Sequence, residues 1–451
     1  MKILVINGSP KGDQSITLQT VNFLKIKFPE HDFSVLNAAQ RIKKLKKDFT
    51  EAADAIKNAE LLLFSYPVYT FIAPCQLHEF IGLLKDAGLD LSQKYASQIT
   101  TSKHFYDVTA HRYVKDNCSD LGIRYIDGLS ADMEDITTKK GREQAEAFLS
   151  HLVWSIENGI YHKPEPAGHT ELFSATLPEP TEKGEGDIVI VADLARDDVR
   201  LKSMIDRFVA VMPIKVRVIN IAEYPFSGGC LGCFDCAATG KCIYKDGFDD
   251  FLRNRIQTAQ ATVYAFSVKD HSMGVNFKTY DDRQFCNGHR TVTMGAPVGY
   301  LVNGDLTREE NLRMIINGRA SVGGNYLAGV ATNETQPDEA IDKLALELEY
   351  AVKNKYLQPS DFYGVGGMKI FRDLIWQMQG LMRADHKFFK KHGQYDFPQK
   401  QRGKMLAMYA VGALMNNKKL KRKMGGRITE GMLMPYNKML DDVKKENNKN
   451  A

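Results

Sequence analysis

Four of the seven cysteines of this 451-residue chain lie close together in the stretch CLGCFDCAATGKC, residues 230–242. They are Cys230, Cys233, Cys236 and Cys242, with the spacing C-x2-C-x2-C-x5-C. Cysteines gathered in one loop are typical of metal binding, redox chemistry or disulfides. The two-residue gaps are those with which bacterial ferredoxins hold iron–sulfur clusters. The neighbouring glycines would let such a loop wrap tightly.

Three interpretations of this loop stay open at the level of the residues. Four thiolates from one loop can surround a [4Fe–4S] cluster, which is the cofactor that we expect here. A zinc site with four thiolate ligands is the alternative metal site, although structural zinc usually takes two well-separated C-x2-C pairs. The third interpretation is a loop of free or redox-active thiols.

Composition narrows the cellular setting. The net charge of +5 is too small to indicate a nucleic-acid partner. The stretch MKILVINGSP lacks the apolar region of a signal peptide, and no apolar run has the roughly 18 residues of a membrane span. We therefore expect a cytoplasmic protein with no membrane span, in which a disulfide framework is disfavoured.

The elements that must position this chemistry alternate between strand and helix patterns. Short apolar runs are followed by segments with helical spacing five times within residues 1–160. Five such units predict a parallel sheet covered by helices on both faces. The expected strands are 2–7, 33–37, 60–69, 95–102 and 123–131.

The same alternation returns after a break. Residues 161–187 are rich in Pro, Gly, Glu and Thr and are expected to form a linker. Residues 188–357 repeat the strand–helix order and predict a second domain of the same type, which contains the cysteine loop. Residues 358–451 show helical patterns only and predict a basic helical C-terminal extension.

The loop between the first strand and the first helix, NGSPKGDQSIT at residues 7–17, has the composition of an anion site. A helix N-terminus offers unpaired N–H groups, and Ser9, Ser15 and Thr17 add hydroxyl donors. There is no Walker lysine and no G-x-G-x-x-G, so a single phosphate monoester fits better than a nucleoside triphosphate or a Rossmann dinucleotide. An ordinary capped turn is the alternative.

Two further loops are expected at the same edge of the first sheet. Residues 65–77 follow the third strand and residues 100–111 follow the fourth. In an open α/β sheet ligands bind at the carboxyl ends of the strands, near the switch point. Together the three loops predict a phosphate with a flat ring attached.

These residues resemble the signature of the flavodoxin-like, NADPH-dependent FMN reductase superfamily. The matching motifs are Gly8-Ser9-Pro10-Lys11, Ser15-Ile16-Thr17 and Pro67-Val68-Tyr69, and the resemblance covers residues 1 to about 155. It implies two flavodoxin-like, doubly wound parallel five-stranded sheets in tandem, with FMN as cofactor. It also implies the cofactor-binding residues Ser9, Pro10, Lys11, Ser15, Ile16 and Thr17 at the phosphate, and Pro67, Val68, Tyr69, Thr70, Thr101, Ser102 and Lys103 at the ring.

The second half resembles iron–sulfur flavoproteins in its cysteine loop but departs from the family in its first loop. Residues 192–203 carry Asp193, Asp197 and Asp198, whose charges would repel a phosphate. The stretch KTYDDR at 278–283 still resembles the family's K-x-x-x-D-R. We therefore expect one FMN in the first half and a cluster in the second, facing each other in an internal pseudo-dimer or a homodimer.

The predicted function is an FMN-dependent NAD(P)H oxidoreductase that passes electrons between nicotinamide, flavin and a [4Fe–4S] cluster. Its partners would be small-molecule or protein electron donors and acceptors. No catalytic side chain is predicted, because the flavin step needs none. The alternatives are a non-catalytic electron carrier similar to flavodoxin and a redox sensor that uses the cysteine loop.

Overall fold

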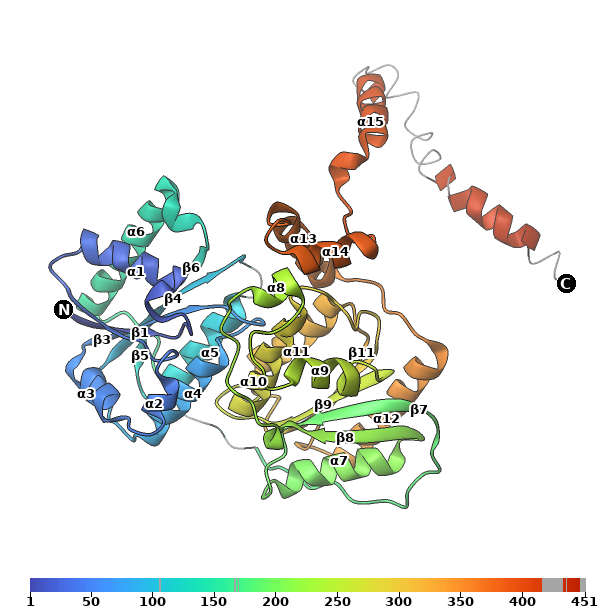
Figure 1. The fold of residues 1–451 in the computed structure, drawn as a ribbon, viewed down its shortest axis with the longest axis horizontal. Helices are drawn as coiled ribbons and strands as arrows, with labels where there is room; N and C mark the ends of the chain where they lie inside the picture. The colour runs from blue at the N-terminus through green and yellow to red at the C-terminus, as the bar shows by residue number, and fades with distance from the viewer. Residues whose placement is uncertain (105–106, 166–167, 169, 416–432, 435, 447–451) are drawn as a thin grey trace. The chain divides into compact units, whose positions relative to one another are not determined.

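The computed structural model describes residues 1–104, 107–165, 168, 170–415, 433–434 and 436–446. Contacts divide the chain into two compact units, Met1–Lys391 and His392–Ala451. The first unit contains two parallel β-sheets, each covered by helices on both faces (Figure 1). This arrangement confirms the predicted α/β fold class of two sheets followed by C-terminal helices.

The first sheet has the strand order β2-β1-β3-β4-β5, which is the flavodoxin order 2-1-3-4-5. Alternate residues of its buried strands serve two different cores. Ile3 and Val5 pack against the helices on one face, and Leu4 and Ile6 pack on the other. The strands are β1 Lys2–Asn7, β2 Asp32–Leu36, β3 Leu61–Pro67, β4 Tyr95–Ser102, β5 Arg124–Tyr125 and β6 Leu129–Asp132.

The expected fifth strand is broken into β5 and β6, which both pair with β4. Two residues separate Ala96 from Ile99 on β4, whereas three separate their partners Tyr125 and Leu129. The extra residue interrupts the ladder as a bulge does. Gly128 lies at the break, where an added Cβ would lie 2.3 Å from the backbone oxygen of Gln98. The close approach of the two backbones there therefore requires glycine.

Helices cover the first sheet in two layers. The face with Ile3 and Val5 carries α1 Ile16–Lys27 and α6 Lys139–Glu157. The opposite face carries α3 Thr50–Asn58, α4 Cys75–Asp86 and α5 Asp107–Asp120, with the short α2 Ile42–Leu45 beside them.

The second sheet repeats the same topology, with the order β8-β7-β9-β10-β11. One face carries α7 Val199–Val211 and α12 Pro337–Asn354, and the other carries α9 Phe248–Phe251, α10 Val275–Arg283 and α11 Glu310–Gly323. The strands are β7 Gly184–Ala192, β8 Ile214–Asn220, β9 Ala261–Ser267, β10 Val298–Asn303 and β11 Leu327–Thr332. β7 thus begins inside the range expected for the linker.

The two halves share one hydrophobic core. A single cluster of buried side chains includes residues of the first half, such as Leu77 and Tyr113, and residues of the second, such as Tyr280 and Ile315. Helix α4 packs against α10, and α5 packs against α11. The helices of corresponding position in the two halves therefore form the contact between them, as in a pseudo-dimer.

The C-terminal region is helical where it is described. α13 Phe362–Gln377 and α14 Arg383–Lys391 belong to the unit that contains the sheets. α15 Arg402–Met415 and the helical residues 436–446 belong to the second unit. The basic run at 416–427 lies outside the described residues. Within the described part of the chain, no helix is long and apolar enough to cross a membrane.

Candidate functional site

The first loop of the predicted site follows β1 and leads into α1. The Asn7 side chain holds it: Nδ2 donates to the Gly12 oxygen at 2.9 Å, and Oδ1 accepts from the Ser9 amide at 3.1 Å. Ser9, Pro10 and Ser15 are buried, and the Ser15 hydroxyl caps α1 by accepting from the Leu18 amide at 3.4 Å. The turn is therefore both an ordinary helix cap and a set of buried hydroxyls at a helix N-terminus.

The loops after β1, β3 and β4 meet at one edge of the sheet. Thr17 Oγ1 lies 2.6 Å from Thr101 Oγ1, and both side chains are buried. Pro67 is the ladder partner of Thr101, and the Val68 amide donates to the Thr101 oxygen at 3.1 Å. The predicted phosphate residues and ring residues are thus neighbours in space.

The remaining predicted residues lie at the rim of this edge. Ser102 Oγ accepts a hydrogen bond from the His104 amide at 2.9 Å. Lys103 Nζ pairs with Asp132 at 2.9 Å, and Ile16 is partly exposed on the first turn of α1. Lys11 reaches the second half, where its Nζ lies 5.6 Å from the centre of the Phe234 ring.

The loop after β3 contains a tight turn in an uncommon backbone conformation. Thr70 and Phe71 have φ values of 47° and 72°, and the backbones of Tyr69 and Ile72 form two hydrogen bonds across them, of 2.8 and 3.2 Å. Two successive non-glycine residues with positive φ carry a conformational cost, so surrounding contacts must hold the turn.

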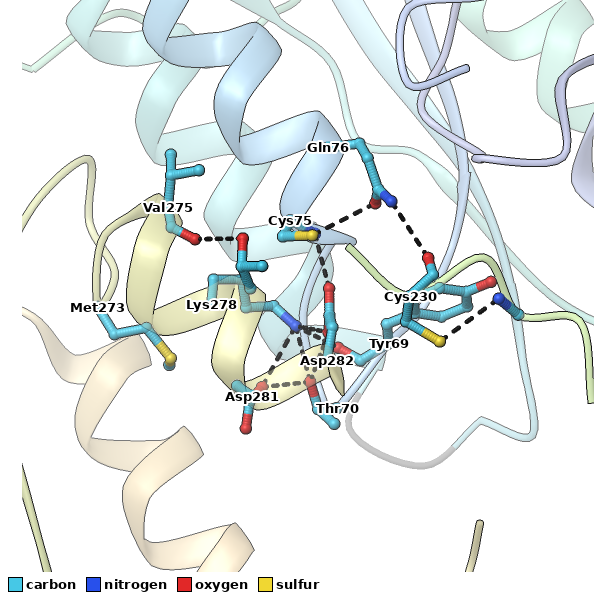
Figure 2. A network of polar contacts seen from close by, with 12 residues as sticks. Tyr69, Thr70, Cys75, Gln76, Cys230, Met273, Val275, Lys278, Asp281 and Asp282 are labelled. Carbon is cyan, nitrogen blue, oxygen red and sulfur yellow. Dashed lines mark hydrogen bonds and ion pairs between the residues drawn. The ribbon is translucent and has the colours of Figure 1, made fainter. Parts of the chain in front are cut away.

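Those contacts come from helix α10 of the second half (Figure 2). Lys278 is fully buried, and its Nζ donates to Thr70 Oγ1 at 2.7 Å and to the Tyr69 oxygen at 3.1 Å. Asp282 is an ion-pair partner of Lys278 and also accepts from the Cys75 amide at 2.7 Å. Burial raises the pKa of Asp282, against the opposing charge of Lys278. The turn of one half is therefore fixed by a buried ion pair of the other.

The arrangement is reciprocal. The second half has the same turn after β9, where Asp270 and His271 have φ values of 51° and 59°. Asp270 accepts from Lys85 at 2.9 Å, and His271 Nε2 lies 3.0 Å from Asp120. Burial lowers the pKa of His271, but its hydrogen bonds to Asp120 and Glu309 and their charges outweigh this effect and raise it to about 10. Each half thus inserts its turn between helices of the other.

The cysteine loop lies directly on the turn of the first half. An added Cβ at Gly232 would lie 2.0 Å from the Tyr69 hydroxyl, and one at Gly229 would lie 2.1 Å from Cys75 Sγ. Gln76 Nε2 donates to the Cys230 oxygen at 3.1 Å (Figure 2). The loop's glycines are therefore needed for close approach to the predicted ring loop.

All four cysteines of the loop are free thiols. Burial raises the pKa of Cys230 strongly and that of Cys236 to about 11. Gly232 N–H donates to Cys230 Sγ at 3.4 Å. Among the described residues, no three Cys, His, Asp or Glu side chains are grouped so that they could hold a metal ion. The thiol positions are thus not those of a preformed metal site.

Two arginines donate hydrogen bonds to backbone oxygens of the cysteine loop. Arg253 donates to the Gly240 oxygen at 2.7 Å, and Arg290 donates to the Cys236 oxygen at 3.2 Å. Arg290 also pairs with the buried Asp385 of α14 at 2.8 Å. Cations and N–H donors around sulfur ligands stabilise thiolates and tune a cluster. The chemistry of this donor set fits an iron–sulfur cluster once the thiols are gathered.

The second half has a carboxylate where the first half has its capping serine. Asp198 caps α7 by accepting from the Leu201 amide at 3.1 Å. Its carboxylate also accepts from Asn303 Nδ2 at 3.0 Å and from the Ser267 hydroxyl. Ser267 and Asn303 end β9 and β10, so this anion occupies the region that corresponds to the first half's phosphate loop. A phosphate at this helix start would lie next to the Asp198 carboxylate.

Sequence reasoning missed the contacts that join the halves. The stretch 278–283 was noted only for its resemblance to a family motif, whereas Lys278 and Asp282 contact Thr70 in the turn after β3. Phe285 stacks edge-on against Tyr69, with ring centres 5.7 Å apart, and nothing in its surrounding sequence marks it.

The fold and the residues at its edge define a flavodoxin-like α/β protein. A family model described as Flavodoxin-like fold matches residues 1–152. An iron-sulfur flavoprotein of Archaeoglobus fulgidus is 29% identical over 175 residues, which cover 36% of this chain and 78% of the relative. Residues 1–152 are thus similar to flavodoxin-like proteins, and the second sheet repeats the topology of the first.

Solved structures with a similar fold match about a third of the chain. An NADH:FMN oxidoreductase in its apo form is 19% identical and covers 37% of this chain and 96% of its own, with a TM-score of 0.30. An FMN-dependent NADH-azoreductase of Bacillus anthracis, in complex with FMN, is 16% identical and covers 34% and 99%, with a TM-score of 0.28.

Proposed function

We propose that the chain is an FMN-dependent NAD(P)H oxidoreductase with one flavin, held at the carboxyl edge of the first sheet. The observation that carries this proposal is the meeting of three loops, in which Thr17 and Thr101 lie 2.6 Å apart and Pro67 pairs with Thr101. A phosphate at one loop and a ring at the other two would be one molecule of FMN's size and chemistry. The match of residues 1–152 to the flavodoxin-like family model supports the same cofactor.

The chain's own residues would bind and orient the cofactor. Ser9, Ser15 and Thr17 would donate to the phosphate together with loop N–H groups. Residues 67–70 and 101–103 would contact the ring, and Lys278 would hold the turn that carries Tyr69. When bound, FMN accepts a hydride and releases electrons singly or in pairs, so the protein supplies placement and electrostatics.

We further propose that Cys230, Cys233, Cys236 and Cys242 bind a [4Fe–4S] cluster. Four thiols in one glycine-rich loop, an N–H donor to Cys230 Sγ and the nearby Arg253 and Arg290 support this assignment. The name of the Archaeoglobus relative points to the same group. Because Gly232 contacts Tyr69, the cluster and the flavin would be neighbours.

The division of labour follows from these sites. Residues 1–160 would form the flavin domain and residues 188–357 the cysteine-loop domain, joined by residues 161–187 and followed by the extension 358–451. Electron donors and acceptors would be small molecules or proteins of the cytoplasm.

Anaerobic purification followed by analysis of flavin, iron and sulfide tests the proposal. We expect one FMN and about four irons per chain. NAD(P)H oxidation with an artificial electron acceptor then separates an enzyme from an electron carrier. A chain that takes up no FMN on reconstitution would contradict the flavin site, and flavin without iron would contradict the cluster alone.

A further inference from the structure

The second half contains a cavity between its sheet and two of its helices. Residues of β9, β10, α10 and α11 line it, and its volume is about 230 Å³. A cavity of roughly 150 Å³ can hold one benzene ring, so this one has room for a single ring with a small substituent. Gln284 and Thr293 line it and are partly exposed, so the cavity reaches the surface. The aromatic residues of its lining are Phe71, Tyr264, Phe277, Phe285 and Tyr300.

The corresponding place in the first half is filled. Phe64 and Tyr264 are each the fourth residue of a seven-residue strand, and their ladder partners on the next strand are Gln98 and Tyr300. Phe64 is 1% exposed and Gln98 is 0% exposed, and Gln98 Nε2 donates to the His111 oxygen at 2.9 Å. Tyr264 lies on the central strand of its sheet and is nevertheless partly exposed. The cavity is therefore a departure of the second half from the packing of the first.

Three hydrogen-bond donors at this cavity have no acceptor among the described residues. They are the hydroxyls of Tyr264 and Tyr300 and the Nε of Arg319. The Tyr300 side chain is 4% exposed. Burial raises the pKa of Tyr264 to about 12 and also raises the pKa of Tyr300, so both hydroxyls keep their protons near neutral pH. Buried donors without an acceptor are costly, and a ligand oxygen at this place would satisfy them.

The charged side chains at the cavity compensate each other. Arg319 Nη2 donates to Asp281 Oδ2 at 2.6 Å and to the Thr70 oxygen at 3.1 Å. Lys278 Nζ lies 3.4 Å from the same Asp281 oxygen. An anionic ligand would face Asp281 and a cationic ligand would face Arg319, each without a partner for its own charge. The cavity therefore favours a neutral molecule.

We propose that this cavity binds a neutral, single-ring aromatic molecule that carries a carbonyl oxygen. The ring would lie among the aromatic side chains, which gain from ring contacts in addition to burial. The carbonyl oxygen would accept from the tyrosine hydroxyls. Water molecules are the alternative content, but aromatic walls offer them few hydrogen-bond partners. The site needs neither the flavin nor the cysteine loop.

Titration of the full-length chain with acetophenone, followed by calorimetry, tests this assignment. We expect a dissociation constant of about 1 mM or below, which is in the range that a ligand of this size can reach. Benzoate has the same ring and a negative charge, and should bind at least about tenfold more weakly. Added FMN should not displace acetophenone, because the proposed flavin site lies elsewhere.

A double variant with Tyr264→Phe and Tyr300→Phe removes both hydroxyls and keeps both rings. Since neither hydroxyl has a protein partner, the melting temperature should not fall, whereas the affinity for acetophenone should fall at least about tenfold. Tyr280→Phe is the matched control, because the Tyr280 hydroxyl is also buried without a partner but Tyr280 lies outside the cavity lining. It should bind as the unchanged chain does. Ala320→Leu adds bulk to the cavity wall and should block binding.

The proposal is overturned if acetophenone does not bind to the unchanged chain, in which case water holds the cavity. It is also overturned if the double variant binds as tightly as the Tyr280→Phe chain, or if FMN displaces the probe, because the probe then occupies another site. Benzoate binding as tight as that of acetophenone would contradict the neutral class of ligand. If Ala320→Leu fails to fold, the double variant, which keeps its rings, still decides the question.

Discussion

The hydroxyl oxygens of Thr17 and Thr101 lie 2.6 Å apart, although 84 residues separate them in the chain. Thr17 lies in the first turn of α1, and Thr101 lies near the end of β4. This hydrogen bond joins the predicted phosphate loop to the predicted ring loop. We therefore expect substitutions in either loop to change the affinity for FMN.

Replacing Ser15 with Asp should abolish FMN binding while leaving the fold intact. Asp caps a helix as well as Ser does, as Asp198 shows at the start of α7. The new carboxylate would face the phosphate, and we expect affinity to fall at least about 100-fold, since a charge-assisted hydrogen bond of roughly 1.5–3 kcal/mol becomes a repulsion. FMN titration monitored by fluorescence measures the loss. Asn22→Asp, on the exposed side of the same helix, is the matched control. Full flavin content in the Ser15→Asp chain would refute the assignment of this loop.

Replacing Lys278 with Met should destabilise the protein and weaken FMN binding. The change leaves Asp282 buried without its ion-pair partner, which costs about 3–5 kcal/mol. It also removes the donor to the Tyr69 backbone oxygen and to the Thr70 hydroxyl. Adding Asp282→Asn removes the uncompensated charge, so stability should partly return while FMN affinity stays about tenfold lower. Melting temperature and FMN affinity are measured on both variants. A double variant with unchanged affinity would show that Lys278 serves stability alone.

Replacing Cys233 with Ser should remove the cluster and spare the flavin. Cys233 is exposed, so the substitution itself should cost little stability. Iron should fall from about four to less than about one per chain after anaerobic reconstitution, with FMN unchanged. Cys286→Ser changes a neighbouring cysteine outside the proposed set and should keep its iron. Equal iron loss in both variants would mean that the ligand set is wrong.

The ion pairs of His271 should make stability depend on alkaline pH. In the folded protein the pKa of His271 is raised to about 10, whereas in the unfolded chain it is near 6.5. The stabilisation is therefore complete below about pH 6.5 and is lost as the pH rises towards 10. His271→Gln should cost most stability at pH 6, and this cost should shrink by up to about 1.4 kcal/mol for each pKa unit of the shift as the pH rises to about 10. Thermal melting of both proteins at pH 6, 8 and 10 checks this. A difference that does not change with pH would exclude His271 as the titrating group. The exposed His162→Gln is the control.

Local patterns were enough to predict most of the fold. Apolar runs such as residues 2–7 and 61–66 marked strands buried on both faces, and Ser15 marked the start of α1. The break at Gly128 could not be foreseen, because the stretch from Ile123 to Ala131 looks like one strand and the contact with Gln98 is not local.

The three loops of the candidate site could be predicted from the sequence, whereas the contacts from the second half that hold the turn at Thr70 could not. Thr70 and Lys278 are 208 residues apart, so their contact depends on how the halves pack. The pairing of the halves was expected, and the contact of Gly232 with Tyr69 agrees with it. The ion pair behind the turn carried no sequence signal beyond a family-like motif.

Because the two halves that share one hydrophobic core belong to a single chain, their association does not depend on protein concentration. A homodimer of two such domains would separate on dilution, and its two sites would always be identical copies. Here a peptide chain joins the halves, so no dissociation equilibrium can part them, however scarce the protein is. The two halves can also carry different residues at matching positions. Ser15 and Asp198, which cap α1 and α7, are one such pair.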